Sequence, residues 1–161
     1  MKNRVVTKTS VFPASKTEVY ERIQRLSTLQ HIAFPYATFK PLNGSDDLVW
    51  QPGHRFEFRF RLFGVIPFGV HTISVIEFDK DRGIYTEEGN RHVPVWNHRI
   101  FIQPIDGGSV RYTDEVEIGA GWKTPFVYLW AKMFYAHRQK RWIRLLKRKP
   151  QTEKNNGKHI G

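Results

Sequence analysis

The chain has 161 residues, which is enough for one domain with a hydrophobic core but short for two. Hydrophobic residues make up 40% of the sequence and aromatic residues 14%, and this composition excludes a disordered body. Cysteine is absent, which excludes disulfides, thiolate nucleophiles and cysteine-bearing zinc sites. A reducing compartment, the cytoplasm, is therefore expected.

The net charge of +11 is concentrated in the C-terminal part of the sequence. Ten of the 26 Lys and Arg residues lie from Thr124 onward, with only one of the 15 acidic residues, Glu153. Such a segment is typical of a solvated helix face, and it also allows peripheral contact with an anionic membrane or an acidic partner. No nucleic-acid partner is expected, because Trp142 is the only aromatic residue interleaved with the charges of the basic segment 138–149.

Neither a secretory signal nor a membrane span is expected. Residues 1–8 have a basic start but lack an apolar h-region. The longest uncharged apolar run, residues 62–70, contains Pro67 and falls well below the roughly 20 residues that a membrane-spanning helix needs.

The N-terminal part of the chain predicts one strand followed by two short helices. Residues 5–12 alternate and are rich in β-branched side chains, which indicates a strand. Ser15 and Glu18 form a capping box that begins a helix. A second helical piece over residues 28–32 is predicted to end before Pro35.

A run of strands without intervening helices follows an irregular stretch. Five strands are predicted, at residues 54–62, 70–78, 84–88, 93–104 and 110–118. The first of these has the clearest alternation, because Phe56, Phe58 and Phe60 are separated by charged residues. This pattern predicts a half-buried antiparallel strand with one face against the core.

A long helix closes the chain, with Thr124 as the predicted N-cap, Pro125 at its first position and an end near Lys147. Residues 1–149 are expected to form one domain, and residues 150–161 a flexible polar and basic tail. Consecutive strands with segregated helices indicate an α+β fold. We expect a curved antiparallel sheet of six or seven strands around the last helix, with space for a ligand between the two.

Several short motifs, among them residues 11–15, residues 18–20 and Trp96–Asn97–His98, resemble those of the START-like (SRPBCC, Bet v 1-like) superfamily. The opening of that superfamily is similar to residues 11–15 and 18–20, and the second half of its ligand-binding SRPBCC domains is similar to Trp96–Asn97–His98, Gly107–Gly108, Asp114–Glu115–Val116 and residues 134–138. The resemblance covers residues 5–146 and implies the helix-grip fold. The superfamily includes lipid carriers, hormone-binding proteins and aromatase/cyclase enzymes, so membership does not choose an activity. Two departures are His137, where an aromatic residue is expected, and a heavier basic extension after Trp142.

The hairpin around residues 106–108 allows a prediction of which side chains share a face. If residues whose numbers sum to about 214 pair, His98, Tyr112 and Asp114 lie on an inner face that is otherwise apolar. A buried carboxylate is costly without a partner, so Asp114 is expected to accept a hydrogen bond from His98 or from the last helix. The pair could be structural, could hold the polar end of a ligand, or could act in acid–base chemistry.

A cavity lined by inward-facing residues of the sheet and the last helix is the predicted ligand site, although the same side chains could fill the core. The expected ligand-binding residues are Phe56, Phe58, Phe60, His71, Ile73, Trp96, His98, Ile100, Tyr112, Asp114, Val116, Trp130, Met133, Phe134 and His137. No metal site is expected, because HxH and HExxH spacings are absent. No cofactor is expected either: Gly119–Ala120–Gly121 lacks the Lys-Ser/Thr of a phosphate loop, and there is no GxGxxG.

Three functions are compatible with these features. The first is a non-catalytic binder of a small hydrophobic molecule, either a lipid or an aromatic, polyketide-like compound. The second is a cyclase- or dehydratase-like enzyme with His98, Asp114 and Tyr112 as catalytic candidates. The third is a docking module that uses the basic segment 138–149 on an anionic membrane or an acidic partner. The sequence predicts neither the oligomeric state nor the ligand.

Overall fold

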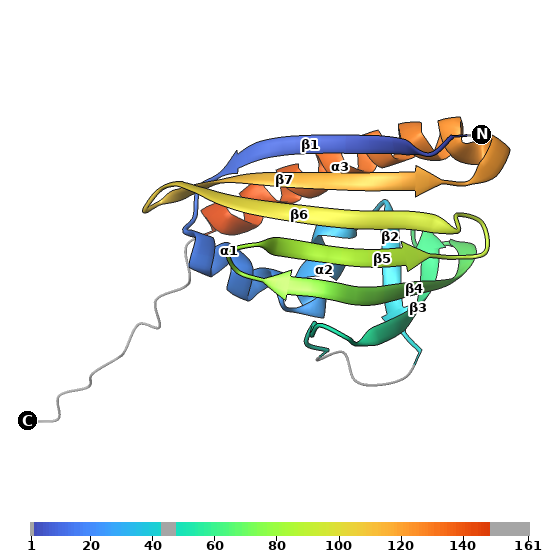
Figure 1. The fold of residues 1–161 in the computed structure, drawn as a ribbon, viewed down its shortest axis with the longest axis horizontal. Helices are drawn as coiled ribbons and strands as arrows, with labels where there is room; N and C mark the ends of the chain where they lie inside the picture. The colour runs from blue at the N-terminus through green and yellow to red at the C-terminus, as the bar shows by residue number, and fades with distance from the viewer. Residues whose placement is uncertain (1, 43–47, 149–161) are drawn as a thin grey trace, which may run out of the picture.

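The computed structural model describes residues 2–42 and 48–148, which form a seven-stranded antiparallel sheet and a long C-terminal helix (Figure 1). The strands are β1 (Arg4–Phe12), β2 (Ala37–Pro41), β3 (Arg55–Leu62), β4 (Ile66–Asp79), β5 (Gly83–Gly89), β6 (Val95–Asp106) and β7 (Ser109–Gly119). The helices are α1 (Lys16–Ile23), α2 (Leu26–Ala33), the 3-10 turn η1 (Gly121–Lys123) and α3 (Thr124–Lys147).

The strand order β1-β7-β6-β5-β4-β3-β2 places the first strand beside the last, and β2 to β7 follow one another as neighbours. Figure 1 shows α3 running along one face of the sheet behind β1 and β7, with α1 and α2 below its C-terminal half. The α+β helix-grip architecture predicted from the sequence is therefore confirmed, with two short helices after the first strand.

The helix ends predicted from local sequence signals were largely correct. The Ser15 side chain accepts a hydrogen bond from the Glu18 amide, 3.2 Å away, as the capping box predicts. At the start of α3 the N-cap is Lys123 instead of Thr124. The Thr124 hydroxyl instead accepts from the Ala120 amide and donates to the Gly121 carbonyl, and so fixes the turn into the helix. The predicted tail at residues 150–161 lies outside the described residues.

Two strand predictions were incomplete. The pattern of residues 37–41 was not recognised as β2, which pairs with β3. The strand β4 begins at Ile66, four residues before the predicted start, because the turn is confined to Phe63, Gly64 and Val65. Positive φ angles at Phe63 and Gly64 close this short turn, and Pro67 follows at a point where the β3–β4 register shifts.

Two groups of aromatic side chains lie between the sheet and α3. Phe12, Tyr112 and Trp142, named here the aromatic core, are fully buried, with ring centroids 4.5 to 5.9 Å apart. Trp96, Trp130, Phe134 and Tyr135 form the second group, nearer the N-terminal end of α3. The first group fills its space, whereas the second forms part of a cavity wall.

Candidate functional site

A cavity of about 540 Å³ lies between the inner face of the sheet and the N-terminal half of α3. The strands β2 to β6 supply most of one wall, and α2, η1 and α3 supply most of the rest, with Ile23 of α1 and Trp50. Aromatic and aliphatic side chains dominate this wall, and a small set of polar groups lies among them. The size and the lining are those of a site for a small organic ligand.

Eight of the fifteen residues proposed from the sequence line this cavity: Phe60, His71, Ile73, Trp96, His98, Ile100, Trp130 and Phe134. Phe58, Tyr112 and Val116 are instead fully buried in the packed core. Phe56 packs on Trp50, with ring centroids 5.0 Å apart. Asp114 is buried behind His98 and does not reach the cavity.

The remaining two, Met133 and His137, differ in position because of the rotational phase of α3. The cavity face of the helix carries Trp130, Phe134 and Arg138, so residues 133 and 137 lie toward its edge. The Met133 side chain is 57% exposed. His137 is half-buried, and its Nε2 donates to the Phe34 carbonyl, 2.7 Å away.

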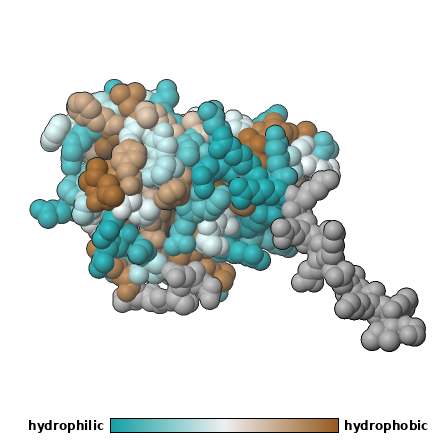
Figure 2. Space-filling view, turned by 180° about the vertical axis from the view of Figure 1, so that it is seen from behind, coloured by the Kyte–Doolittle hydropathy of each residue, from teal (hydrophilic) through white to brown (hydrophobic). Residues whose placement is uncertain are grey.

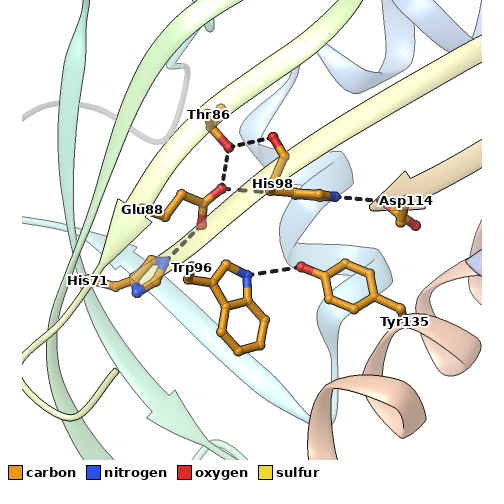
Figure 3. Close-up of polar contacts among 7 residues, drawn as sticks. All are labelled: His71, Thr86, Glu88, Trp96, His98, Asp114 and Tyr135. Atoms are coloured by element: carbon orange, nitrogen blue, oxygen red, sulfur yellow. Dashed lines mark hydrogen bonds and ion pairs between the residues drawn. The ribbon is translucent and has the colours of Figure 1, made fainter. Parts of the chain in front are cut away.

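The hairpin register predicted from the sequence is confirmed, since His98 pairs with Val116 and Ile100 with Asp114. His98 Nε2 lies 2.7 Å from Asp114 Oδ1, and Gln139 Nε2 donates to Asp114 Oδ2 at 2.9 Å. Both partners expected for the buried carboxylate, the histidine and the last helix, are therefore present. Figure 3 shows this contact at one end of a row of polar side chains.

Toward the other end of the row lies Glu88, which sequence reasoning missed. Its Oε1 accepts from the Thr86 hydroxyl at 2.6 Å, and its Oε2 lies 2.8 Å from His71 Nε2 (Figure 3). His98 lies between the two carboxylates, with its Nδ1 3.9 Å from Glu88 Oε1. The alternation of Ile84, Thr86 and Glu88 could have indicated this position, because alternate residues of a strand face the same side.

Asn90 fixes the hydrogen position on His71. The Asn90 Oδ1 accepts from the backbone amides of His92 and Val93, so the Asn90 Nδ2 is the group that faces His71 Nδ1, at 3.2 Å. An amide nitrogen can only donate, so His71 Nδ1 accepts. The His71 hydrogen is therefore on Nε2, which donates to Glu88.

Both carboxylates remain charged in this setting. Burial raises the pKa of the Glu88 carboxyl, but the hydrogen bond from His71 and the neighbouring His98 and Thr86 outweigh it and hold the pKa below its ordinary value. Burial likewise raises the pKa of the Asp114 carboxyl. The hydrogen bond from His98, the charge of Arg138 and the hydrogen bond from Gln139 outweigh burial and hold this pKa below its ordinary value. The cavity wall and the layer behind it thus carry two buried negative charges.

Arg138 supplies a buried positive charge on the other wall. The sequence placed this residue in the exposed basic segment, but its side chain is 5% exposed and lines the cavity. Burial lowers the pKa of the guanidinium, whereas Asp114 and the neighbouring tyrosines raise it to a net value above the ordinary one. Burial also raises the pKa of the Tyr135 hydroxyl far above its usual range, so it keeps its hydrogen at neutral pH.

The rim of the cavity carries an apolar stripe on α3 and η1. Trp122, Phe126, Leu129 and Met133 are more than half exposed and follow helical spacing. Trp122 and Phe126 also line the cavity. Figure 2, which views the side covered by α3, shows brown side chains gathered toward the end where α3 begins and teal ones over much of its C-terminal half.

No three His, Asp or Glu side chains within residues 2–42 and 48–148 are arranged to hold a metal ion together. In the same ranges, the helices all fall short of the length and apolar character that a bilayer span requires.

Solved structures with a similar fold identify the fold class of the protein. A START superfamily protein from Mycobacterium smegmatis is 16% identical with a TM-score of 0.67, over 88% of this chain and 96% of that chain. Protein CV1439 from Chromobacterium violaceum is 15% identical with a TM-score of 0.69, over 90% of this chain and 98% of that chain. Norcoclaurine synthase from Thalictrum flavum, in complex with dopamine and hydroxybenzaldehyde, is 12% identical with a TM-score of 0.64, over 93% of this chain and 90% of that chain. The chain therefore has a START-like fold.

Within that class, residues 10–146 match the family described as Domain of unknown function (DUF8410), and the chain belongs to this family. No curated protein matches the sequence.

Proposed function

We propose that the protein binds a small, predominantly apolar molecule in the cavity between the sheet and α3. The observation that carries this proposal is the cavity itself, about 540 Å³ of unfilled space lined by large side chains. Protein interiors are normally packed without voids of this size, because each unfilled volume loses contacts. The norcoclaurine synthase complex, in which the same fold accompanies two small aromatic molecules, supports a ligand of similar dimensions.

The polar groups favour binding over the cyclase-like alternative. Of its three catalytic candidates, Tyr112 belongs to the aromatic core, and both oxygens of Asp114 are occupied by His98 and Gln139. Only His98 lines the cavity. A group that reacts with a substrate must come within hydrogen-bond distance of it, and two of the three candidates lie behind the wall.

Mass spectrometry of an organic extract of the natively purified protein, against a heat-denatured control, tests the proposal. We expect a near-stoichiometric apolar compound, or, if the protein is purified empty, saturable binding of the neutral fluorophore N-phenyl-1-naphthylamine at one site. An empty extract together with no saturable fluorophore binding would contradict the proposal.

A second candidate function is docking on an anionic membrane, favoured by the apolar stripe at the rim. The exposed basic residues Lys140, Arg144, Lys147 and Arg148 lie on or next to the same helix. Each basic residue near an anionic surface contributes about 1 kcal/mol, and exposed aromatic side chains can enter the interface. A ligand could then pass between membrane and cavity across Trp122 and Phe126, which belong to both rim and wall.

Sedimentation with phosphatidylcholine vesicles, with and without phosphatidylglycerol, tests the docking. We expect binding only to the anionic vesicles, with a several-fold loss in a triple Arg144→Glu, Lys147→Glu, Arg148→Glu variant and in a double Leu129→Asp, Met133→Asp variant.

Charge reversal of the exposed Arg55, Arg59 and Arg61 on β3 is the matched control and should change binding less. Equal loss in all three variants, or none, would exclude this surface.

A further inference from the structure

The cavity wall that α3 forms carries hydrogen-bond donors for which no described residue supplies an acceptor. The indole Nε1 of Trp130 and the guanidinium Nε of Arg138 are buried without a partner, and both residues line the cavity. Trp130, Phe134 and Arg138 are four residues apart, so they lie on one stripe of the helix. The Phe134 ring contacts both, with its centroid 4.7 Å from the Trp130 ring and 5.6 Å from Arg138 Cζ.

Tyr135 adds a third donor beside Arg138. Its hydroxyl oxygen accepts from Trp96 Nε1 at 3.0 Å (Figure 3), and its own hydrogen has no acceptor among the described residues. The hydroxyl keeps that hydrogen because burial raises its pKa. Arg138 Cζ lies 5.0 Å from the centre of the Tyr135 ring, so the two donors are neighbours.

The buried acceptors near the cavity are already occupied by other groups. Both oxygens of Asp114 accept from His98 and Gln139, and both oxygens of Glu88 accept from Thr86 and His71. Among the described residues, no carboxylate forms a salt bridge with Arg138. A buried N–H or O–H group whose hydrogen no other group accepts is destabilising, so three such hydrogens on one wall indicate that a bound molecule supplies the acceptor.

We propose that Trp130, Tyr135 and Arg138 form a subsite for an oxygen acceptor, so that the ligand is amphipathic. Its carbonyl or carboxylate oxygen is held by the donors on α3, and its hydrocarbon or aromatic part lies against the apolar walls. The inference rests on the proposed binding function and deepens it by naming the polar group of the ligand. A carboxylate and a ketone share the required chemistry, since each offers an oxygen with two lone pairs to N–H and O–H donors.

Three ligands of nearly equal size test this subsite by displacement of N-phenyl-1-naphthylamine: butylbenzene, butyrophenone and 4-butylbenzoic acid. We expect the wild-type protein to bind the ketone, the acid or both roughly tenfold more tightly than butylbenzene, the ratio given by one or two net hydrogen bonds. The order of ketone and acid identifies which oxygen the subsite prefers. Trp130→Phe, Tyr135→Phe and Arg138→Lys should each lower this preference, measured as the ratio to butylbenzene in the same variant, about threefold or more.

Two matched variants provide the control. Tyr112 and Trp142 also bury an unpartnered hydroxyl and indole nitrogen, but neither residue lines the cavity. Tyr112→Phe and Trp142→Phe should therefore keep the wild-type preference. Trp130→Phe keeps the test decisive if Arg138→Lys does not fold, because Trp130 is only half-buried.

Saturable fluorophore binding with no preference for the oxygen-bearing ligands, or equal shifts in test and control variants, would overturn the subsite alone. Absence of all binding would overturn the proposed function as well.

Discussion

The two ends of α3 pack against the same sheet in different ways. At the C-terminal half, Trp142 packs with Phe12 and Tyr112 into the aromatic core and leaves no solvent-exposed surface. At the N-terminal half, Trp130 and Phe134 surround a cavity, and Phe126 is 68% exposed at its rim. The same helix thus packs fully against the sheet at one end and borders an unfilled cavity at the other.

The largest expected effect is the loss of stability in a Trp142→Ala variant. Removal of a fully buried indole from the aromatic core should lower the free energy of unfolding by about 3–5 kcal/mol. Phe126→Ala at the rim should lower it by less than about 0.5 kcal/mol, because that side chain is mostly exposed. Urea unfolding monitored by circular dichroism measures both. Similar losses would show that the two halves of α3 contribute equally.

Asp114→Ala should have the next largest effect, because it leaves His98 buried without its acceptor and removes one of the two acceptors of Gln139 Nε2. We expect a loss of about 3 kcal/mol in the free energy of unfolding, as for other broken buried pairs. Asp106→Ala is the matched control, since this carboxylate accepts hydrogen bonds in an exposed turn. If Asp114→Ala were as mild as the control, the buried pair would not support the fold.

A smaller effect should come from enlarging one isoleucine in the packed core and one in the cavity wall. Ile102 is buried outside the cavity, so Ile102→Phe should overpack the core and cost about 1–3 kcal/mol. Ile73 lines the cavity, so Ile73→Phe should cost less than about 1 kcal/mol and should weaken binding of N-phenyl-1-naphthylamine severalfold. Unfolding and fluorescence titrations measure the two quantities, and equal destabilisation by both changes would contradict an unfilled cavity.

The last prediction concerns the loss of stability as the pH is lowered, which is the smallest effect near neutral pH. The folded-state pKa values of Glu88 and Asp114 lie below their ordinary values of 4.5 and 3.8, so each carboxylate contributes stability that is fully present above those values. This contribution is lost as the pH falls through the folded-state pKa values. Urea midpoints measured from pH 7 to pH 3 should fall in the acid range for wild type, and less steeply for Glu88→Gln. An equal slope in the variant would contradict a role for Glu88.

The sequence predicted the architecture better than the site, for a physical reason. Alternation in β3 and the glycine pair of the β6–β7 turn are local signals. The turn defined the register that brings His98 to Asp114. The short strand β2 was missed because a five-residue segment next to Pro35 has too little periodicity.

The inward side of α3 was harder to assign because apolar residues occur around much of its first half. Met133 looked as buried as Trp130, and the basic residue that lines the cavity, Arg138, could not be separated from its exposed neighbours. Only the packing of the helix on the sheet decides these positions.

The distribution of tryptophan gives the protein a built-in optical reporter. Four of its five indoles, those of Trp50, Trp96, Trp122 and Trp130, border the cavity, whereas Trp142 is enclosed in the aromatic core. Emission of an indole depends on the polarity of its surroundings, so filling the cavity should shift the spectrum of four chromophores and leave the fifth as an internal reference. Occupancy can therefore be read from the unlabelled protein, in a purified sample or in a mixture with vesicles.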